Sequence, residues 1–204
     1  AGDEVDAIRR QVYAATTAGF IEQYRIGPAG ACLTLVARCQ IPPVLGQLVT
    51  GLAFDGFNGM LWAVNPAGLA AMIFPPGAAG CAVRCTFQAR CPTPIGRVTG
   101  LAYDSCSELL YMITEPSPVG LGPTVIVNQV GVAALCGRTI QCCPVVGLPN
   151  PFIGGLAMDP LKPTGTCGQG CSGRGCPPCV PAIGTQGLPA IGTRCFTITL
   201  YGAP

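Results

Sequence analysis

The sequence predicts an all-β protein built from about four repeats of roughly 50 residues, each a four-stranded antiparallel sheet braced by disulfides. Two observations carry this prediction. The phrase Gly-Leu-Ala-x-Asp begins at Gly51, Gly100 and Gly155. Between its copies the chain runs in short apolar or aromatic segments that end at Gly, Pro or Asn-Gly, as strands joined by hairpins do. A period in this range indicates a repeat architecture, against which the other features are interpreted.

The second repeat displays its four segments most clearly. The first two, 51–55 and 60–64, flank a turn that contains Asn58-Gly59, a strong hairpin signal. The third covers 69–74 and stops at a pair of prolines. The fourth, 85–91, alternates between polar and apolar residues like a half-exposed strand. We therefore predict four antiparallel strands in this repeat.

The other repeats follow the same plan with irregular ends. The matching segments are 11–19, 20–26 and 32–39 in the first repeat and 109–114, 124–130 and 138–143 in the third. Residues 3–10 are the one charged stretch and could form a helical turn or an edge strand. In the fourth repeat the pattern recovers only at 195–201. Atypical terminal repeats are expected of such arrays.

These boundaries predict a single repeat domain over residues 1–204. Its approximate repeats are 1–50, 51–99, 100–154 and 155–204, with an insertion rich in Cys, Gly and Pro at 164–181.

The repeated phrase also carries a family resemblance. Gly-Leu-Ala-[Phe/Tyr/Met]-Asp, followed by Leu61-Trp62 or Leu110-Tyr111, resembles the first hairpin of a blade in the β-propeller superfamily that includes NHL-type and gluconolactonase-like repeats. The resemblance covers residues 11–160. It implies either a closed disc, in which residues 3–10 supply the missing strand of the first blade, or an open stack whose edge another copy covers.

Fourteen cysteines in 204 residues indicate an oxidising, exported setting and a disulfide framework. The framework comprises Cys32, Cys39, Cys81, Cys85, Cys91, Cys106, Cys136, Cys142, Cys143, Cys167, Cys171, Cys176, Cys179 and Cys195.

Several of these cysteines bracket a predicted fourth strand. The pairs are Cys32 with Cys39, Cys85 with Cys91, and Cys136 with Cys142 or Cys143. Residues six or seven apart on one extended strand are about 20 Å apart, too far for a disulfide. We therefore predict bonds between strands or between repeats. Cys81 and Cys106 lack repeat counterparts, and we expect them to pair locally or with another subunit.

The cluster Cys167, Cys171, Cys176 and Cys179 has two interpretations. Four thiolates can hold zinc, but the spacing does not suit a typical zinc ribbon, and two local disulfides that staple a Gly-rich loop are favoured. A redox role for Cys176-Pro-Pro-Cys179 would require a helix N-terminus, which its Pro- and Gly-rich surroundings do not provide. We expect no metal here.

Asp55, Asp104 and Asp159 recur at the end of the first segment. They could form a ring of carboxylates that binds a cation, or each could cap a tight turn through its own backbone. Turn chemistry is favoured, because a calcium site takes six to eight oxygen ligands and acidic residues are scarce. Tyr13 and Trp62 share a repeat position with Tyr111, where packing between blades is the favoured interpretation over a ligand platform.

Composition limits the functional classes. Half of the chain is hydrophobic and 10% is charged, with a net charge of +2. No basic run suggests nucleic acid, and Gly or Pro interrupts every apolar run before it reaches the length of a membrane span. The chain has no His, which removes Ser/His/Asp and Cys/His catalysis. We therefore expect no enzymatic activity and no cofactor.

The sequence favours an exported structural protein, a self-assembling subunit of an extracellular filament, sheath or surface layer whose partners are other copies of itself. Low charge favours self-association, and an exposed sheet edge can be completed by a neighbouring subunit. The polar N-terminus without Met is typical of a mature exported chain. The alternative is a small secreted β-propeller that binds a ligand or a protein partner. A lactonase-like hydrolase is a third hypothesis, which the scarcity of acids and the missing His disfavour.

Overall fold

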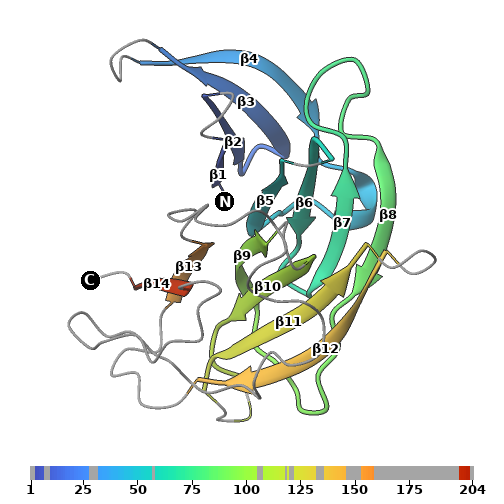
Figure 1. The fold of residues 1–204 in the computed structure, drawn as a ribbon, viewed down its shortest axis with the longest axis vertical. Coiled ribbons are helices and arrows are strands. Elements are labelled where there is room, and N and C mark those ends of the chain that lie inside the picture. The colour runs from blue at the N-terminus through green and yellow to red at the C-terminus, as the bar shows by residue number, and fades with distance from the viewer. Residues whose placement is uncertain are drawn as a thin grey trace, which may run out of the picture.

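The computed structural model describes residues 3–6, 10–27, 32–56, 58–104, 108–117, 119, 122–131, 136–145, 153–158 and 198–202. Of residues 3–6, 153–158 and 198–202 it describes the backbone course and pairing. Within these ranges the chain is all-β apart from one short 3-10 turn (Figure 1).

Three four-stranded antiparallel sheets follow one another along the chain, and in each the strands are ordered as in the sequence. We call them blades 1 to 3. Blade 1 contains β1 (Asp3–Asp6), β2 (Gln11–Ala15), β3 (Phe20–Ile26) and β4 (Leu33–Gln40). Blade 2 contains β5 (Gly51–Asp55), β6 (Met60–Val64), β7 (Leu69–Ile73) and β8 (Val83–Gln88). Blade 3 contains β9 (Val98–Asp104), β10 (Leu109–Thr114), β11 (Thr124–Val130) and β12 (Gly137–Pro144).

A fourth sheet pairs β13 (Ile153–Met158) with β14 (Ile198–Gly202). The 3-10 turn η2 (Pro43–Leu45) lies in the link between blades 1 and 2. The segment around 195–201 resembles a fourth strand in sequence, yet the strand it contains, β14, pairs directly with the first strand of its sheet.

The blades are arranged as in a propeller. The first strands are neighbours in series, β1 beside β5, β5 beside β9, and β9 beside β13. The fourth strands β4, β8 and β12 lie on the outer rim (Figure 1). The predicted all-β, disulfide-braced blades are therefore confirmed. Blade 1 takes its first strand from its own chain, because β1 pairs with β2, and the alternative of a helical turn at 3–10 is wrong for residues 3–6.

Glycine at the start of the repeated phrase allows the inner strands to approach one another. A Cβ on Gly51 would lie 2.6 Å from the Cβ of Leu101, in the first strand of the next blade. That distance is shorter than van der Waals contact, so the centre of the array requires a residue without a side chain at this position.

Two cores fill the spaces between the blades. Side chains alternate across each strand, so β6 sends Leu61 and Ala63 into the core with blade 1, and Met60, Trp62 and Val64 into the core with blade 3. All five are at most 3% exposed. Because both faces of β6 are buried, its sequence is a continuous apolar run.

Aromatic pairs recur at the blade interfaces. Tyr13 of blade 1 stacks on Phe54 of blade 2 with ring centroids 5.4 Å apart. Trp62 of blade 2 meets Tyr103 of blade 3 at 6.4 Å, and also contacts Phe87. Each pair joins the aromatic of a second strand to the variable residue of the next Gly-Leu-Ala-x-Asp phrase. The favoured packing role of Tyr13 and Trp62 agrees with this arrangement.

Candidate functional site

Disulfides tie consecutive blades together along the outer rim. Blade 1 is joined to blade 2 by Cys39–Cys81, and blade 2 to blade 3 by Cys85–Cys136 and Cys91–Cys142; the Cα–Cα distances are 5.8, 5.6 and 5.9 Å respectively. These bonds run between repeats, as the strand geometry predicts. We call them the rim disulfides.

The expectation for Cys81 is wrong. Cys81 pairs neither locally nor with another subunit but with Cys39, 42 residues earlier in the chain. Its repeat counterpart is Cys136, since both lie just before the fourth strand of their blade and both have positive φ angles, 59° and 57°. The bracketing pattern in the sequence aligns Cys136 with Cys85 instead, which conceals this equivalence.

The other cysteines differ in status. Cys143 is also disulfide-bonded. Cys32 is a free, exposed thiol just before β4. The remaining members of the predicted framework lie outside the described residues; they are Cys106, Cys167, Cys171, Cys176, Cys179 and Cys195.

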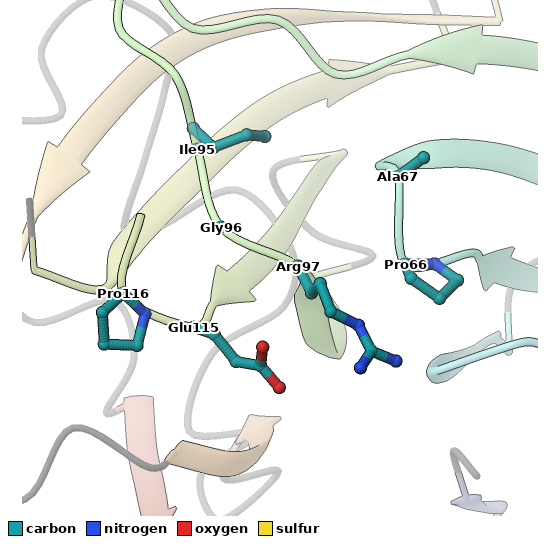
Figure 2. A pocket seen from close by; sticks show the side chains of 7 residues that line it. All are labelled: Pro66, Ala67, Ile95, Gly96, Arg97, Glu115 and Pro116. Atoms are coloured by element: carbon teal, nitrogen blue, oxygen red, sulfur yellow. The ribbon is translucent and has the colours of Figure 1, made fainter. Parts of the chain in front are cut away.

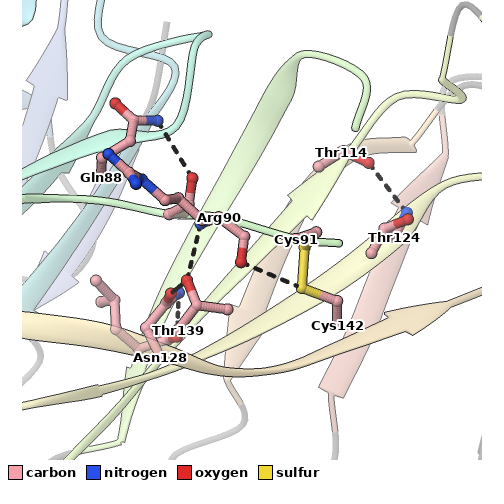
Figure 3. Close-up of a disulfide and its surroundings, with 10 residues drawn as sticks. Gln88, Arg90, Cys91, Thr114, Thr124, Asn128, Thr139 and Cys142 are labelled. Atoms are coloured by element: carbon pink, nitrogen blue, oxygen red, sulfur yellow. Dashed lines mark hydrogen bonds between the residues drawn. A yellow bond between two sulfur atoms is a disulfide. The ribbon is translucent and has the colours of Figure 1, made fainter. Parts of the chain in front are cut away.

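A hydrogen-bonded chain accompanies the disulfide Cys91–Cys142 (Figure 3). The backbone N–H of Arg90 donates to Oγ1 of Thr139 at 3.0 Å, and the Thr139 hydroxyl donates to Oδ1 of Asn128 at 2.8 Å. Asn128 is fully buried, and its Nδ2 donates to the Leu110 carbonyl at 3.1 Å. The polar groups of Asn128 are thus used to hold the end of blade 2 against blade 3.

Asp55 stabilises a turn, as the favoured interpretation of the repeated aspartates predicts. Its carboxylate accepts from the backbone N–H of Asn58 at 3.0 Å and from the Asn58 side-chain amide at 2.7 Å. The Gly59 N–H donates to the Asp55 carbonyl at 2.8 Å. These bonds close the hairpin between β5 and β6. Asp104 occupies the equivalent end of β9, and Asp159 lies outside the described residues.

Asp55 also reaches the neighbouring blade. Its carboxylate accepts a hydrogen bond from the hydroxyl of Tyr103. Burial raises the pKa of Tyr103 above its ordinary value of 10.0, and the negative charge of Asp55 raises it further. Within the ranges that the structure describes, no three Asp, Glu, His or Cys side chains lie close enough to hold a metal ion.

A shallow cleft of about 390 Å³ opens between blades 2 and 3. Its walls are the turn after β6 and the segments beside β9 and β10, and it is lined by Pro66, Ala67, Ile95, Gly96, Arg97, Glu115 and Pro116. The charged ends of Arg97 and Glu115 lie on the same side of the cleft (Figure 2). Both backbone walls are fixed, because Glu115 N–H donates to the Arg97 carbonyl at 2.8 Å and Val98 N–H donates to the Pro66 carbonyl at 3.0 Å.

The most unusual surface is the face of blade 1 that points away from blade 2. Tyr13 and Ile21 pack toward blade 2. Their neighbours along the strands therefore point the other way. Val12 pairs with Tyr24, Tyr24 with Leu35, and Ala14 with Glu22. We call Val12, Ala14, Glu22, Tyr24 and Leu35 the far face of blade 1.

The far face is partly open, unlike its counterparts. At the equivalent positions of blade 2, Leu61 pairs with Ile73 and Ala63 with Ala71, and all four are fully buried against blade 1. In blade 1, Leu35 is 47% exposed, and the other far-face residues are only half-buried.

The predicted site residues do not include this face or the cleft. Aligning the third segments places Glu22 and Tyr24 opposite the apolar Ala71 and Ile73, and this difference is the one signal in the sequence that marks the face as distinct. The cleft leaves no such signal, since its shape depends on backbone turns in two separate repeats.

The described residues contain no helix of the length and hydropathy that crossing a membrane requires.

Neither a family model nor a curated protein matches the sequence. Two solved structures that resemble the fold are described as "Structure of U3-55K" and "Crystal structure of RRP9 WD40 repeats". The first is 18% identical with a TM-score of 0.47, over 76% of this chain and 41% of that chain. The second is 16% identical with a TM-score of 0.49, over 76% of this chain and 40% of that chain. This chain therefore spans about two fifths of the length of these structures. The resemblance to NHL-type and gluconolactonase-like repeats stays a prediction.

Proposed function

We propose that this chain is an exported structural protein that assembles with other copies of itself into an extracellular filament, sheath or surface layer. Its blades act as a disulfide-braced building block, without a catalytic role and without a cofactor. The observation that carries the proposal is that, among the described residues, the array is braced along its rim and open at one end.

The bracing comes from the rim disulfides. Each joins cysteines at least 42 residues apart, so it closes a long loop and restricts the unfolded chain strongly. Disulfides of this kind persist in oxidising surroundings and suit a protein that must survive outside the cell.

The open end lies at blade 1. In the described part of the chain β13 lies against β9 and β10, and makes no comparable contact with β1. The series of inner strands therefore runs from β1 to β13 without closing on itself there. An interface that does not close within one molecule generates a polymer when another copy continues it.

The composition is consistent with assembly. Only 10% of the chain is charged and its net charge is +2, so little electrostatic repulsion opposes contact between copies. Exposed apolar side chains on β4, namely Leu33 and Leu35, enlarge the surface available for such contact.

Negative-stain electron microscopy of the native protein, before and after reduction, tests the proposal. Regular filaments or sheets that resist denaturant until the disulfides are reduced are the expected result. Discrete particles of single-chain size, at all concentrations, would contradict it.

A secreted binding module is the second candidate, and the cleft between blades 2 and 3 favours it. The opposite charges of Arg97 and Glu115 beside apolar walls could orient a small polar ligand or a peptide segment. Retention of a defined partner by the wild-type protein, lost in Arg97→Ala while the particle size is unchanged, would favour this function over assembly. A hydrolase activity that requires stoichiometric divalent metal would contradict both.

A further inference from the structure

We propose that a second copy of this chain covers the far face of blade 1. The inference rests on the proposed self-assembly and names the surface that it uses. Three features of the described residues support it. The equivalent sheet face is covered in the two blades that follow, Cys32 lies beside the face, and Tyr24 and Glu22 on the face are hydrogen-bonded to each other.

The first feature is that the same sheet face is covered in the blades that follow. Leu61 and Ala63 in β6 pack on blade 1, and Leu110 and Met112 in β10 pack on blade 2; all four are fully buried. Val12 and Ala14 of β2 hold the corresponding positions and remain partly exposed. A further blade seated on this face would continue the packing that the array already uses twice.

The second feature is the free cysteine beside the face. Cys81 lies just before β8 and Cys136 just before β12, and each bonds to a cysteine of the preceding blade. Cys32 holds the same place before β4, and its thiol is free and exposed. Cys32 therefore occupies the position of a cysteine that bonds to the preceding blade. In the described residues, blade 1 has no preceding blade to which it could bond.

The third feature is that two polar groups of the face are already hydrogen-bonded to each other. The hydroxyl of Tyr24 donates a hydrogen bond to the carboxylate of Glu22. The guanidinium of Arg38, on the strand beside Glu22, lies over the ring of Phe20 at 5.0 Å from its centroid. Covering the face would therefore leave the Tyr24 hydroxyl with its hydrogen-bond partner, which lowers the cost of burying that group.

A second copy is the occupant that these features favour. The last described sheet of this chain lies on blade 3, and β13 makes no contact with β1 comparable to its contact with β9, so the described residues do not cover the far face. The far face includes the exposed Leu35 of β4, and the exposed Leu33 on the same strand extends its apolar surface. Continuation of the array by another molecule buries this surface in the way that blade 1 buries the face of blade 2.

Matched charge substitutions on two fourth strands provide the test. Leu35→Glu changes a far-face residue that is 47% exposed, and Ile140→Glu changes a residue of β12 that is 49% exposed, so both variants should fold equally well. Sedimentation velocity measures association over a hundredfold concentration range. We expect Leu35→Glu to raise the concentration at half-association by roughly tenfold or more, because the new carboxylate would be buried without a partner. Ile140→Glu should resemble the wild type.

Alkylation of Cys32 by a maleimide gives a second measurement on the same surface. In the wild-type protein the rate should fall as association proceeds, and in Leu35→Glu it should stay at the rate of an exposed thiol. Equal association of both variants, with microscopy still revealing polymers, would overturn this inference and leave the proposed function standing. A wild-type protein that stays a single chain at every concentration, with its Cys32 protected from alkylation, would mean that the chain covers its own face and would overturn both.

Discussion

Cys136 lies just before β12 and forms a disulfide with Cys85 in β8, linking the outer strands of blades 2 and 3 across 51 residues of sequence. Cys81 stands in the same place before β8 and bonds to Cys39 in β4. The blades are thus joined at their outer strands, far from the glycine-lined approach of the inner strands. In such an array the inner strands lie close together and the outer strands diverge. The disulfides therefore restrain the blades where they are furthest apart.

Removal of the bond between Cys85 and Cys136 should destabilise the fold strongly. Because Cys91–Cys142 remains in place, the bond Cys85–Cys136 closes only the ring formed by residues 85–91 and 136–142, which the loop-entropy model values at roughly 3 kcal/mol at 25 °C. We expect the double substitution Cys85→Ser with Cys136→Ser to lower the free energy of unfolding by about this amount, measured by guanidinium denaturation. Cys32→Ser is the control, because Cys32 is free; a loss of equal size in the control would contradict the account.

Trp62→Ala should cost about 3–5 kcal/mol of stability, because it removes a large, fully buried side chain from the core between blades 2 and 3. Trp62→Phe should cost markedly less. Its ring keeps much of the packing, and it deletes an indole N–H that has no hydrogen-bond partner among the described residues. Thermal unfolding followed by circular dichroism compares the two, since Trp62 is the sole tryptophan and fluorescence would be lost in both. Similar destabilisation by both substitutions would indicate that the indole N–H is bonded after all.

Stability should fall as the pH rises above about 10, and Tyr103 should cause part of the fall. Burial and the charge of Asp55 raise the pKa of Tyr103 in the folded protein above 10.0. The unfolded chain therefore releases the proton first, and ionisation above its pKa favours unfolding. The stabilising contribution is fully present below pH 10 and is lost at higher pH.

Denaturation midpoints at pH 8 and pH 11 measure this contribution. Tyr103→Phe cannot ionise, so its midpoint should change less between the two pH values than that of the wild type. At high pH the free thiol of Cys32 can exchange with the disulfides. The measurement is therefore repeated after Cys32 has been alkylated. An equal decline in both proteins would contradict the role of Tyr103.

Gly96→Ala should destabilise the protein and distort the cleft. A Cβ on Gly96 would lie 2.1 Å from the Glu115 carbonyl oxygen and 2.6 Å from that of Pro116, and both obstacles are backbone. Forced shifts of this kind cost about 1–3 kcal/mol. Gly56→Ala is the matched control, because its Cβ would meet only the Phe54 ring at 3.8 Å. Differential scanning fluorimetry should place the melting temperature of Gly96→Ala several degrees lower, with Gly56→Ala near the wild type.

Much of the fold follows from local signals in the sequence. The strands Met60–Val64, Phe20–Ile26 and Thr124–Val130 match their predicted segments at both ends. Each is a short run bounded by turn residues, so its length is set locally. The fourth strands are shifted by up to three residues, as in Val83–Gln88, because they lie half-exposed on the rim where the apolar pattern is weak.

The site was less predictable because it depends on how distant repeats meet. Strand geometry predicts that Cys39 and Cys85 bond between repeats, but the choice of Cys81 and Cys136 as partners depends on which hairpin ends meet in space. The openness of the face around Leu35 also cannot be read from one strand, since apolar residues there resemble those that are buried elsewhere.

Self-association of the intact, oxidised protein is the central claim, and its concentration dependence tests that claim most directly. Sedimentation velocity over a hundredfold range should give a weight-average sedimentation coefficient that rises steadily with concentration, as an open-ended assembly requires. A coefficient that stays at the value of a single chain throughout that range would contradict the account.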